Sequence, residues 1–314
     1  MRHKSTARPF WPEYKVGSMK YKKHGKNGKF QVQVWQDKQW KTLRANSKAF
    51  ADFLIATGQT STQYDASDPK PFAPKSYRDF MLYEAHFIAA ATNFAKANRP
   101  GAYRIAKLYQ KLTGKLHPKL KPAPHWYEKP IYYMGNHLNF YGHDQTIVWP
   151  QYSRIMDYEL ELGFVLAKPL YNASSEEALA AIGGFVVFND FSARDTQMPE
   201  MQSGFGPQKS KHFANAISAE FVTADEILPR INSLSGTVTI NGKPMAEVSS
   251  SGMQYTLGEA LAHVSQGERL FPGEFFGTGT LPGGCGLESG IMLSKGDRIS
   301  IAIAGIGRLS NVIG

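Results

Sequence analysis

The chain has 314 residues, of which 42% are hydrophobic and 20% are charged, as in an ordinary globular protein that buries a sizeable core. It contains no apolar run of the roughly 18 residues that a membrane-spanning helix needs, and its single cysteine excludes an internal disulfide framework. The lone cysteine and the absence of an apolar signal region predict a cytoplasmic protein.

The net charge of +10 is unevenly placed. Residues 1–50 contain 13 Lys or Arg and two acidic residues, a net +11, so the other 264 residues sum to about −1. Such a basic segment could contact nucleic acid or another polyanion. A lysine-rich hairpin is more often a solvated face, so nucleic-acid binding is not our expectation.

The N-terminal segment predicts a small β-containing domain. A turn cluster at residues 25–28 and strict alternation over residues 30–35 indicate a β-hairpin that continues to Leu43. A short helix is expected over residues 47–57. Three prolines then mark residues 58–75 as a linker between two domains.

A longer helix is predicted after the linker. Ser76 with Asp79 three residues later resembles a capping box, and the apolar residues that follow recur at helical spacing. We therefore expect a helix over residues 77–97. Asp79 and His86 are two helical turns apart and would share one face of it. A capping aspartate and an ordinary histidine are the plainer interpretation of the pair.

Three carboxylates stand out in apolar surroundings. Glu159 and Glu161 are two residues apart, so in a strand they project from the same face. The Val- and Phe-rich run at residues 184–188 predicts a buried strand that ends close to Asp190. Buried carboxylates without sulfur or histidine ligands suggest a hard cation. A half-solvated strand explains Glu159 and Glu161 equally well on spacing alone.

The C-terminal third is mostly β in pattern. Residues 202–212 are irregular, polar and glycine-rich, as in a site loop. The Asn241-Gly242 turn predicts a hairpin over residues 235–249. A helix over residues 257–264 and a last strand over residues 298–304 are also expected.

Two features in this region do not predict chemistry. The glycines from residue 277 to residue 286 lack the Gly-Lys-Ser/Thr ending of a phosphate-binding loop, so no nucleotide cofactor is indicated. Cys285 lies among these glycines with no histidine adjacent in sequence. We interpret it as a small packing residue rather than a nucleophile.

Several ordered motifs together resemble the fumarylacetoacetate hydrolase (FAH) superfamily, from about Ser76 to the last residue. They are Arg78-Asp-Phe with His86, Asp157-Tyr-Glu-Leu-Glu-Leu-Gly163, Asn189-Asp-Phe-Ser-Ala-Arg-Asp195 with Gln197, Gly206-Pro-x-x-x-Lys211-x-Phe213, and Gly277-Thr-Gly-Thr280 followed by Gly-Cys-Gly-Leu-Glu288. The resemblance implies a mixed, β-rich α+β fold and a homodimer. Residues 73–314 would form a β-roll catalytic domain of mixed sheets, and residues 1–72 a small basic domain.

The resemblance also implies a divalent cation, Mg²⁺ first, with Ca²⁺ and Mn²⁺ as alternatives. The metal ligands of the family correspond to Glu159, Glu161, Asp190 and Asp79. The general base of the family falls on His86, and the glutamate that orients this base falls on Glu288.

Other matches concern the substrate. Lys211 and Gln197 correspond to polar groups that face the substrate oxygens, and Thr280, Asn215 and Arg194 correspond to further substrate-binding positions. Met81 and Met201 replace tyrosines that help to hold the acidic substrate of fumarylacetoacetate hydrolase itself. The activity implied is metal-dependent hydrolysis of a carbon–carbon bond in a 1,3-dicarbonyl compound, more hydrophobic than fumarylacetoacetate.

Two alternatives stay open. Asn139 and His143 imitate the base motif of smaller superfamily members, although Thr146 stands where those proteins carry a glutamate. The superfamily also contains decarboxylases and enol–keto isomerases of 2-oxo acids, because one metal site serves several reactions. A small dicarbonyl or 2-oxo acid is the expected substrate in each case.

Overall fold

The computed structural model describes residues 19–314, so the first part of the basic N-terminal stretch, residues 1–18, lies outside the described residues. The larger of two main sheets has 11 strands within residues 19–314 and mixes parallel with antiparallel pairs. Its spatial order is β3 (Gln39–Thr42), β2 (Lys29–Gln36), β1 (Lys20–Lys26), β13 (Glu220–Thr223), β10 (Ile182–Asp190), β9 (Leu160–Leu166), β16 (Glu274–Gly277), β4 (Ser76–Phe80) and β5 (Tyr132–Met134), with β12 (Asn215–Ile217) paired to β10 and β6 (Phe140–Tyr141) paired to β12.

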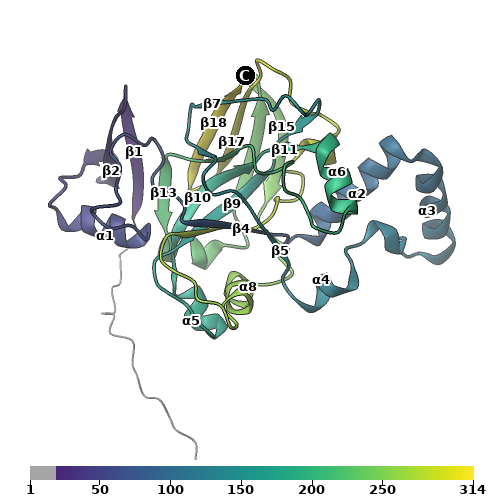
Figure 1. The fold of residues 1–314 in the computed structure, drawn as a ribbon, viewed down its shortest axis with the longest axis horizontal. Helices are drawn as coiled ribbons and strands as arrows, with labels where there is room; N and C mark the ends of the chain where they lie inside the picture. Colours follow the sequence, from purple (N-terminus) through teal and green to yellow (C-terminus); the bar gives the residue numbers. More distant parts are fainter. Residues whose placement is uncertain (1–18) are drawn as a thin grey trace, which may run out of the picture.

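A smaller sheet packs against the centre of the larger one (Figure 1). Its spatial order is β15 (Lys243–Ser249), β14 (Ser235–Ile240), β17 (Arg298–Ile303), β18 (Gly307–Ile313) and β7 (Thr146–Ile147), while β8 (Met156–Asp157) and β11 (Ser192–Ala193) form a separate pair. The mixed, β-rich α+β architecture that we expected is therefore confirmed.

Helices surround the sheets. They are α1 (Lys48–Ala56), α2 (Glu84–Asn98), α3 (Pro100–Thr113), α4 (Pro124–Glu128), α5 (Ser175–Leu179), α6 (Arg194–Gln202), α7 (Ala224–Ile227), α8 (Leu257–Val264) and α9 (Gly286–Ser289), with short 3₁₀ turns η1 (Pro118–Leu120) and η2 (Leu228–Arg230). Figure 1 shows α1 with the N-terminal strands at one end of the molecule and α3 standing out at the other. Within residues 19–314, every helix is too short or too polar to cross a membrane.

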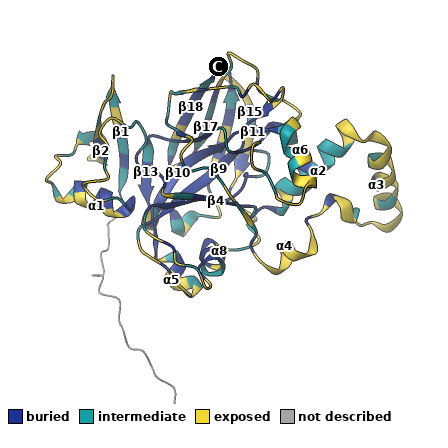
Figure 2. Cartoon of the chain, in the orientation of Figure 1, coloured by how far each residue is buried: buried dark blue, intermediate teal, exposed yellow. Residues whose placement is uncertain are grey.

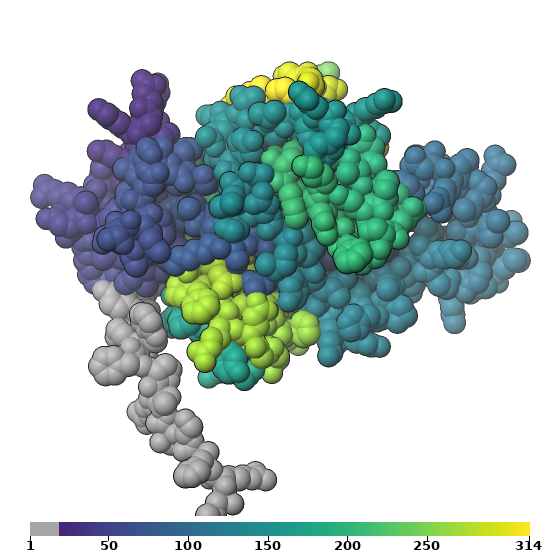
Figure 3. All heavy atoms as spheres, in the orientation of Figure 1, coloured from purple at the N-terminus to yellow at the C-terminus, as the bar shows by residue number. Residues whose placement is uncertain are grey.

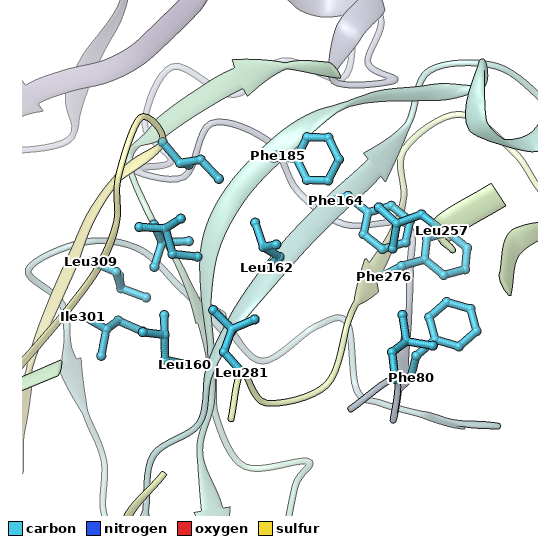
Figure 4. Close-up of a cluster of buried hydrophobic side chains, with 14 of the residues drawn as sticks. Phe80, Leu160, Leu162, Phe164, Phe185, Leu257, Phe276, Leu281, Ile301 and Leu309 are labelled. Atoms are coloured by element: carbon cyan, nitrogen blue, oxygen red, sulfur yellow. The ribbon is translucent and has the colours of Figure 1, made fainter. Parts of the chain in front are cut away.

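Strand β9 occupies the middle of the core, and all seven of its residues are buried. Because side chains alternate along a strand, Leu160, Leu162 and Phe164 point into the core between the sheets, whereas Glu161 and Val165 face the other way. In Figure 4, Leu160 lies beside Ile301 of the smaller sheet. The same view shows Phe164 and Phe276 side by side, with ring centroids 5.4 Å apart. This apolar core holds β9 in place, and with it Glu161 in the strand and Glu159 immediately before it.

The N-terminal segment extends the larger sheet rather than standing apart. Strand β1 pairs with β13, and Tyr21, Phe53 and Phe221 pack together in a second apolar cluster. The predicted hairpin and the helix that Ser47 caps are both confirmed. The division into residues 1–72 and 73–314 stays a prediction.

The helix predicted over residues 77–97 is wrong in its first part. Residues Ser76–Phe80 form β4, which pairs with β16 on one side and β5 on the other, and α2 begins only at Glu84. Asp79 therefore lies in a strand and does not cap a helix. Backbone pairing on both sides of a buried segment outweighed a local helical pattern.

The predictions for the C-terminal third are mostly confirmed. The structure contains the β14–β15 hairpin about Asn241 and Gly242, helix α8 and strand β17. Strand β17 is not the last strand, because β18 follows it and pairs with it. The sequence analysis also missed helix α6, whose mixed polar sequence contains Pro199 and has no apolar face.

Candidate active site

One cavity of about 770 Å³ collects most of the predicted site residues. It opens among β4, β5, the start of α2, α6 and the irregular loop that follows α6. Nine of the thirteen predicted residues line it, namely Asp79, Met81, His86, Glu159, Glu161, Gln197, Met201, Lys211 and Thr280. Segments up to 200 residues apart in the chain thus meet at one surface.

Three buried carboxylates form a cluster at this cavity. Asp79 comes from β4, Glu161 from β9 and Asp190 from the end of β10. One oxygen of each lies within 4.8 Å of an oxygen of the other two. Gly277 of β16 leaves them room, because a Cβ there would lie 2.3 Å from Asp79 Oδ1 and 2.7 Å from Glu161 Oε2.

Burial and mutual repulsion disfavour the ionised form of two carboxyl groups in this cluster. Burial, and then the neighbouring Asp79 and Asp190 carboxylates, raise the pKa of Glu161 well above its usual value. Burial and Asp190 likewise raise the pKa of Asp79. Glu161 Oε1 and Asp190 Oδ1 are buried and have no hydrogen-bond partner within residues 19–314. Oxygen atoms arranged in this way fit a hard divalent cation.

Glu159 lies beside this cluster with both its oxygens in ion pairs. Lys211 Nζ is 2.6 Å from Glu159 Oε2, and Arg194 Nη2 is 2.7 Å from Oε1. Burial opposes ionisation, but these two cations together lower the pKa of Glu159. Lys211 Nζ is also 2.6 Å from Asp190 Oδ2. Glu159 is therefore held as a carboxylate next to the proposed cation, and its role as a ligand stays a prediction.

His86 and Glu288 form a pair at the cavity wall. His86 Nδ1 lies 2.8 Å from Glu288 Oε1, and the Gly283 N–H donates to Glu288 Oε2 at 2.9 Å. Within residues 19–314 no hydrogen bond engages His86 Nε2. A histidine oriented by a fixed carboxylate, with its second nitrogen free, is suited to act as a general base.

His143 does not share this environment. Its Nδ1 accepts a hydrogen bond from the Ser310 N–H at 3.1 Å, and its Nε2 lies 3.3 Å from the exposed Asp144. It is not among the described residues that line the cavity. Of these two histidines, only His86 lines the cavity, and its role as the base stays a prediction.

Two predicted substrate-binding residues lie behind the cavity wall. The Arg194 guanidinium is fully engaged with Asp157, Glu159 and the Gln197 Oε1 atom. The Asn215 side chain is fully buried, and neither of its polar atoms has a hydrogen-bond partner within residues 19–314. Arg194 can position Glu159 and Gln197, but neither Arg194 nor Asn215 lines this cavity, and their roles in substrate binding stay predictions.

The sequence analysis missed Tyr133. Its hydroxyl donates to Asp190 Oδ2 at 2.7 Å, and its ring lines the cavity. Tyr133 lies in β5, and no local signal connects it with an aspartate 57 residues later. The predicted site loop is confirmed as part of the cavity wall, since Phe205, Gln208 and His212 line it.

Asp157 connects Arg194 to the helix that carries Glu288. It pairs with Arg194 at 2.6 Å and accepts the Gly286 and Leu287 N–H groups at 2.7 and 2.9 Å. We expect Asp157→Asn to lower the free energy of unfolding by about 3 kcal/mol, because it leaves a buried guanidinium short of a partner. Urea denaturation would measure this loss.

Asp144→Asn is the matched control, since Asp144 pairs with Arg298 where both side chains are more than half exposed. Asp144→Asn should lower the free energy of unfolding by less than about 1 kcal/mol. Equal losses in the two variants would contradict the role of the buried network.

Cys285 is buried, and burial raises the pKa of its thiol well above the usual value. We expect native protein at pH 8 to resist alkylation by iodoacetamide, whereas urea-unfolded protein reacts in full, because the thiolate is the reactive form. Mass spectrometry would count the adducts. Rapid labelling of the native protein would contradict the interpretation as a packing residue.

Comparison with known proteins agrees with this architecture. The family model described as the C-terminal part of fumarylacetoacetate (FAA) hydrolase matches residues 102–314, so the chain belongs to the fumarylacetoacetate hydrolase superfamily. The resemblance found in the sequence motifs is thereby confirmed. The solved structure of a fumarylacetoacetate hydrolase from Exiguobacterium antarcticum is similar with a TM-score of 0.66 and 20% identity, covering 94% of this chain and 99% of that one.

Relatives with other names are also similar. The mitochondrial oxaloacetate tautomerase FAHD2A of Bos taurus is 29% identical over 193 residues, which are 61% of this chain and 60% of the bovine one. A fumarylpyruvate hydrolase from Pseudomonas aeruginosa, solved with Mn²⁺ and pyruvate, has a TM-score of 0.56 at 20% identity, covering 77% of this chain and 96% of that one. The chain thus belongs to a family of enzymes with differing reactions.

Proposed function

We propose that this protein is a divalent-cation-dependent hydrolase that cleaves a carbon–carbon bond of a 1,3-dicarbonyl compound, such as an acylpyruvate. The observation that carries the proposal is that one cavity is lined by His86, which pairs with Glu288, and by Asp79 and Glu161, which cluster with Asp190. The first can activate water, and the second can hold a cation beside the substrate carbonyls. Hydrolysis by the route proposed here uses both.

Asp79, Glu161 and Asp190 would hold the cation, with Glu159 and Lys211 adjacent. Oxygen-only ligands favour Mg²⁺, with Ca²⁺ and Mn²⁺ as alternatives, and the Mn²⁺ in the P. aeruginosa relative supports a divalent ion. A bound cation would polarise the substrate carbonyl oxygens and stabilise negative charge that develops on them.

The protein residues have separate tasks. His86 takes a proton from water while Glu288 stabilises the resulting imidazolium, and the hydroxide adds to one carbonyl carbon. The bond between that carbon and the central carbon then breaks, and its electron pair passes to the second carbonyl as an enolate. His86 returns the proton to the central carbon, which gives a carboxylic acid and a ketone.

Lys211 and Gln197 are placed to stabilise the developing charge. Arg194 Nη1 donates to Gln197 Oε1 at 2.8 Å, which turns the amide so that its NH₂ group remains available to a substrate oxygen. Lys211 is buried, and the Asp190 and Glu159 carboxylates raise its pKa although burial opposes this. It therefore stays charged beside the reacting oxygens.

The cavity favours an apolar substrate. Met81 and Met201 both line it, together with Phe80, Ile131 and Phe205. No arginine is among the described residues of its wall, so no guanidinium is available to grip a distal carboxylate. We propose that alkyl acylpyruvates and β-diketones are better substrates than fumarylacetoacetate.

The test is an assay of purified protein with Mg²⁺, Mn²⁺ or Ca²⁺ on a series of acylpyruvates and on fumarylacetoacetate. We expect two-fragment products, with ¹⁸O from labelled water in the new carboxylate. A kcat/KM for fumarylacetoacetate equal to that for the alkyl compounds would contradict the apolar substrate. Products without any fragmentation would contradict hydrolysis.

The bovine relative named as an oxaloacetate tautomerase supports a second candidate. The same His86 could move a proton between the enol oxygen and the carbon of a 2-oxo acid without adding water. Loss of the enol absorbance of oxaloacetate with no CO₂ would favour the isomerase, and CO₂ release would favour a decarboxylase. We also propose that the protein is a homodimer, as the resemblance implies, and that it is cytoplasmic, as its single cysteine predicts.

A further inference from the structure

The most basic part of the described structure other than the N-terminal hairpin is an arm beside the cavity. This basic arm, residues 85–127, runs from the second residue of α2 through α3 and η1 to Tyr127 of α4, and Glu84 and Glu128 lie immediately outside it. It contains eight Lys or Arg and no Asp or Glu, so its net charge is +8. The cations are Lys96, Arg99, Arg104, Lys107, Lys111, Lys115, Lys119 and Lys121. Within residues 19–314, no carboxylate forms an ion pair with any of them.

Helix α3 also carries an exposed apolar stripe. Ile105, Leu108 and Leu112 follow the i, i+3, i+7 spacing of one helix face, and they are 66%, 56% and 76% exposed. Another face of the helix is buried at Ala106, about 100° round the helix from Ile105, and within the arm the Tyr109 ring packs edge-on against His117, with ring centroids 5.1 Å apart. The stripe therefore points away from the body of the protein, and Figure 2 shows α3 as one of the most exposed helices.

Cations border the stripe. Arg104, Lys107 and Lys111 lie beside it on the helical wheel, and Lys115 follows after the left-handed Gly114 that ends α3. In the space-filling view of Figure 3, residues of this arm form the projection at one end of the molecule. A flat partner could approach the projection without meeting the rest of the chain.

The apolar stripe and the cations beside it together indicate what kind of partner α3 could bind. A polyanion such as nucleic acid would neutralise the lysines but would leave three aliphatic side chains in water. A neutral apolar surface would cover the aliphatic side chains but not the charge. A bilayer with anionic headgroups offers both, since aliphatic side chains enter the acyl boundary while lysines reach the phosphates. We propose that α3 docks this protein on an anionic phospholipid surface.

The experiment is co-sedimentation of the full chain with vesicles at 0.1 M salt. Vesicles of phosphatidylcholine with one quarter phosphatidylglycerol are compared with pure phosphatidylcholine. We expect retention only on the anionic vesicles. Replacing Ile105, Leu108 and Leu112 with serine should reduce retention at least tenfold, and so should the double change Lys107→Glu with Lys111→Glu. Circular dichroism confirms that each variant keeps its fold.

The matched control is Lys26→Glu with Lys29→Glu, which makes the same charge change on exposed positions of the N-terminal hairpin. It should retain wild-type binding. The proposal is overturned if wild-type protein does not sediment with anionic vesicles. It is also overturned if the hairpin control loses as much binding as the arm variants, or if the serine variant binds fully, because charge alone would then explain retention. A serine variant that binds vesicles normally but no longer self-associates in analytical ultracentrifugation would assign the stripe to a second copy instead.

Discussion

His86→Ala is expected to reduce turnover by about 10²- to 10⁴-fold while cation binding stays intact. The reason is geometric: His86 Nδ1 is committed to Glu288 at 2.8 Å, so the ring is held with its other nitrogen free to accept a proton from water. Steady-state kinetics would measure kcat, and calorimetric titration with Mn²⁺ would measure cation affinity in the same variant.

His143→Ala is the control for this prediction. His143 bonds to the backbone of Ser310 and does not line the cavity, so its replacement should leave kcat within about twofold of the wild type. Glu288→Gln should resemble His86→Ala in direction, since it removes the charge that stabilises the imidazolium. A full loss of turnover in His143→Ala with an active His86→Ala would reverse the assignment.

The second large effect concerns the carboxylate cluster. We expect Mn²⁺ or Mg²⁺ to stabilise the wild-type protein against heat, by about 2.7 kcal/mol when the free ion is at 100 times its Kd. Glu161→Gln should abolish this stabilisation together with turnover, because it replaces one of the three carboxylates whose oxygens lie within 4.8 Å of one another by a neutral amide. Differential scanning calorimetry with and without the ion would test it.

Glu161→Gln should not destabilise the protein when a chelator has removed the cation. Without a cation, the buried Glu161 carboxyl faces two like charges, and burial together with those charges raises its pKa. An amide removes that repulsion, so metal-free Glu161→Gln should be at least as stable as the metal-free wild type. Asp144→Asn, at an exposed carboxylate, controls for charge removal and should keep the full response to the ion. An undiminished response in Glu161→Gln would exclude the cluster as the cation site.

Local sequence patterns predicted helices and strands correctly where interactions between neighbouring residues decide the structure. The Asn241-Gly242 turn needs backbone with positive φ, which both residues adopt, and the hairpin around it is as expected. Helix α8 has its capping box at Thr256 and Glu259 and follows its predicted bounds. The helix prediction was wrong at residues 76–80 because non-local contacts decide their structure. Their strand partners in β16 and β5 come from distant parts of the chain.

The candidate site shows the same difference between what local sequence patterns predict and what distant contacts decide. Strand periodicity alone predicted that Glu159 and Glu161 share one face of a strand, and the ordered motifs connected them with Asp79, His86 and Asp190; in the structure Glu161 lies in β9 and Glu159 immediately precedes it. No sequence pattern showed that Glu159 pairs with Lys211 and Arg194, while one oxygen of Glu161 has no hydrogen-bond partner in the described part of the chain. The same holds for Tyr133, which reaches Asp190 only because β4 pairs with β5.

The sequence by itself determined the type of several strands, the family and the residue types of the site, because alternation, turn chemistry and motif order are properties of neighbouring residues. Only the tertiary structure decided which carboxylates share a cation-sized space, which histidine faces the cavity and which cations remain unpaired on α3. Those outcomes depend on contacts between segments up to 200 residues apart, and the free energy of burying a charge is set by whatever those contacts bring beside it.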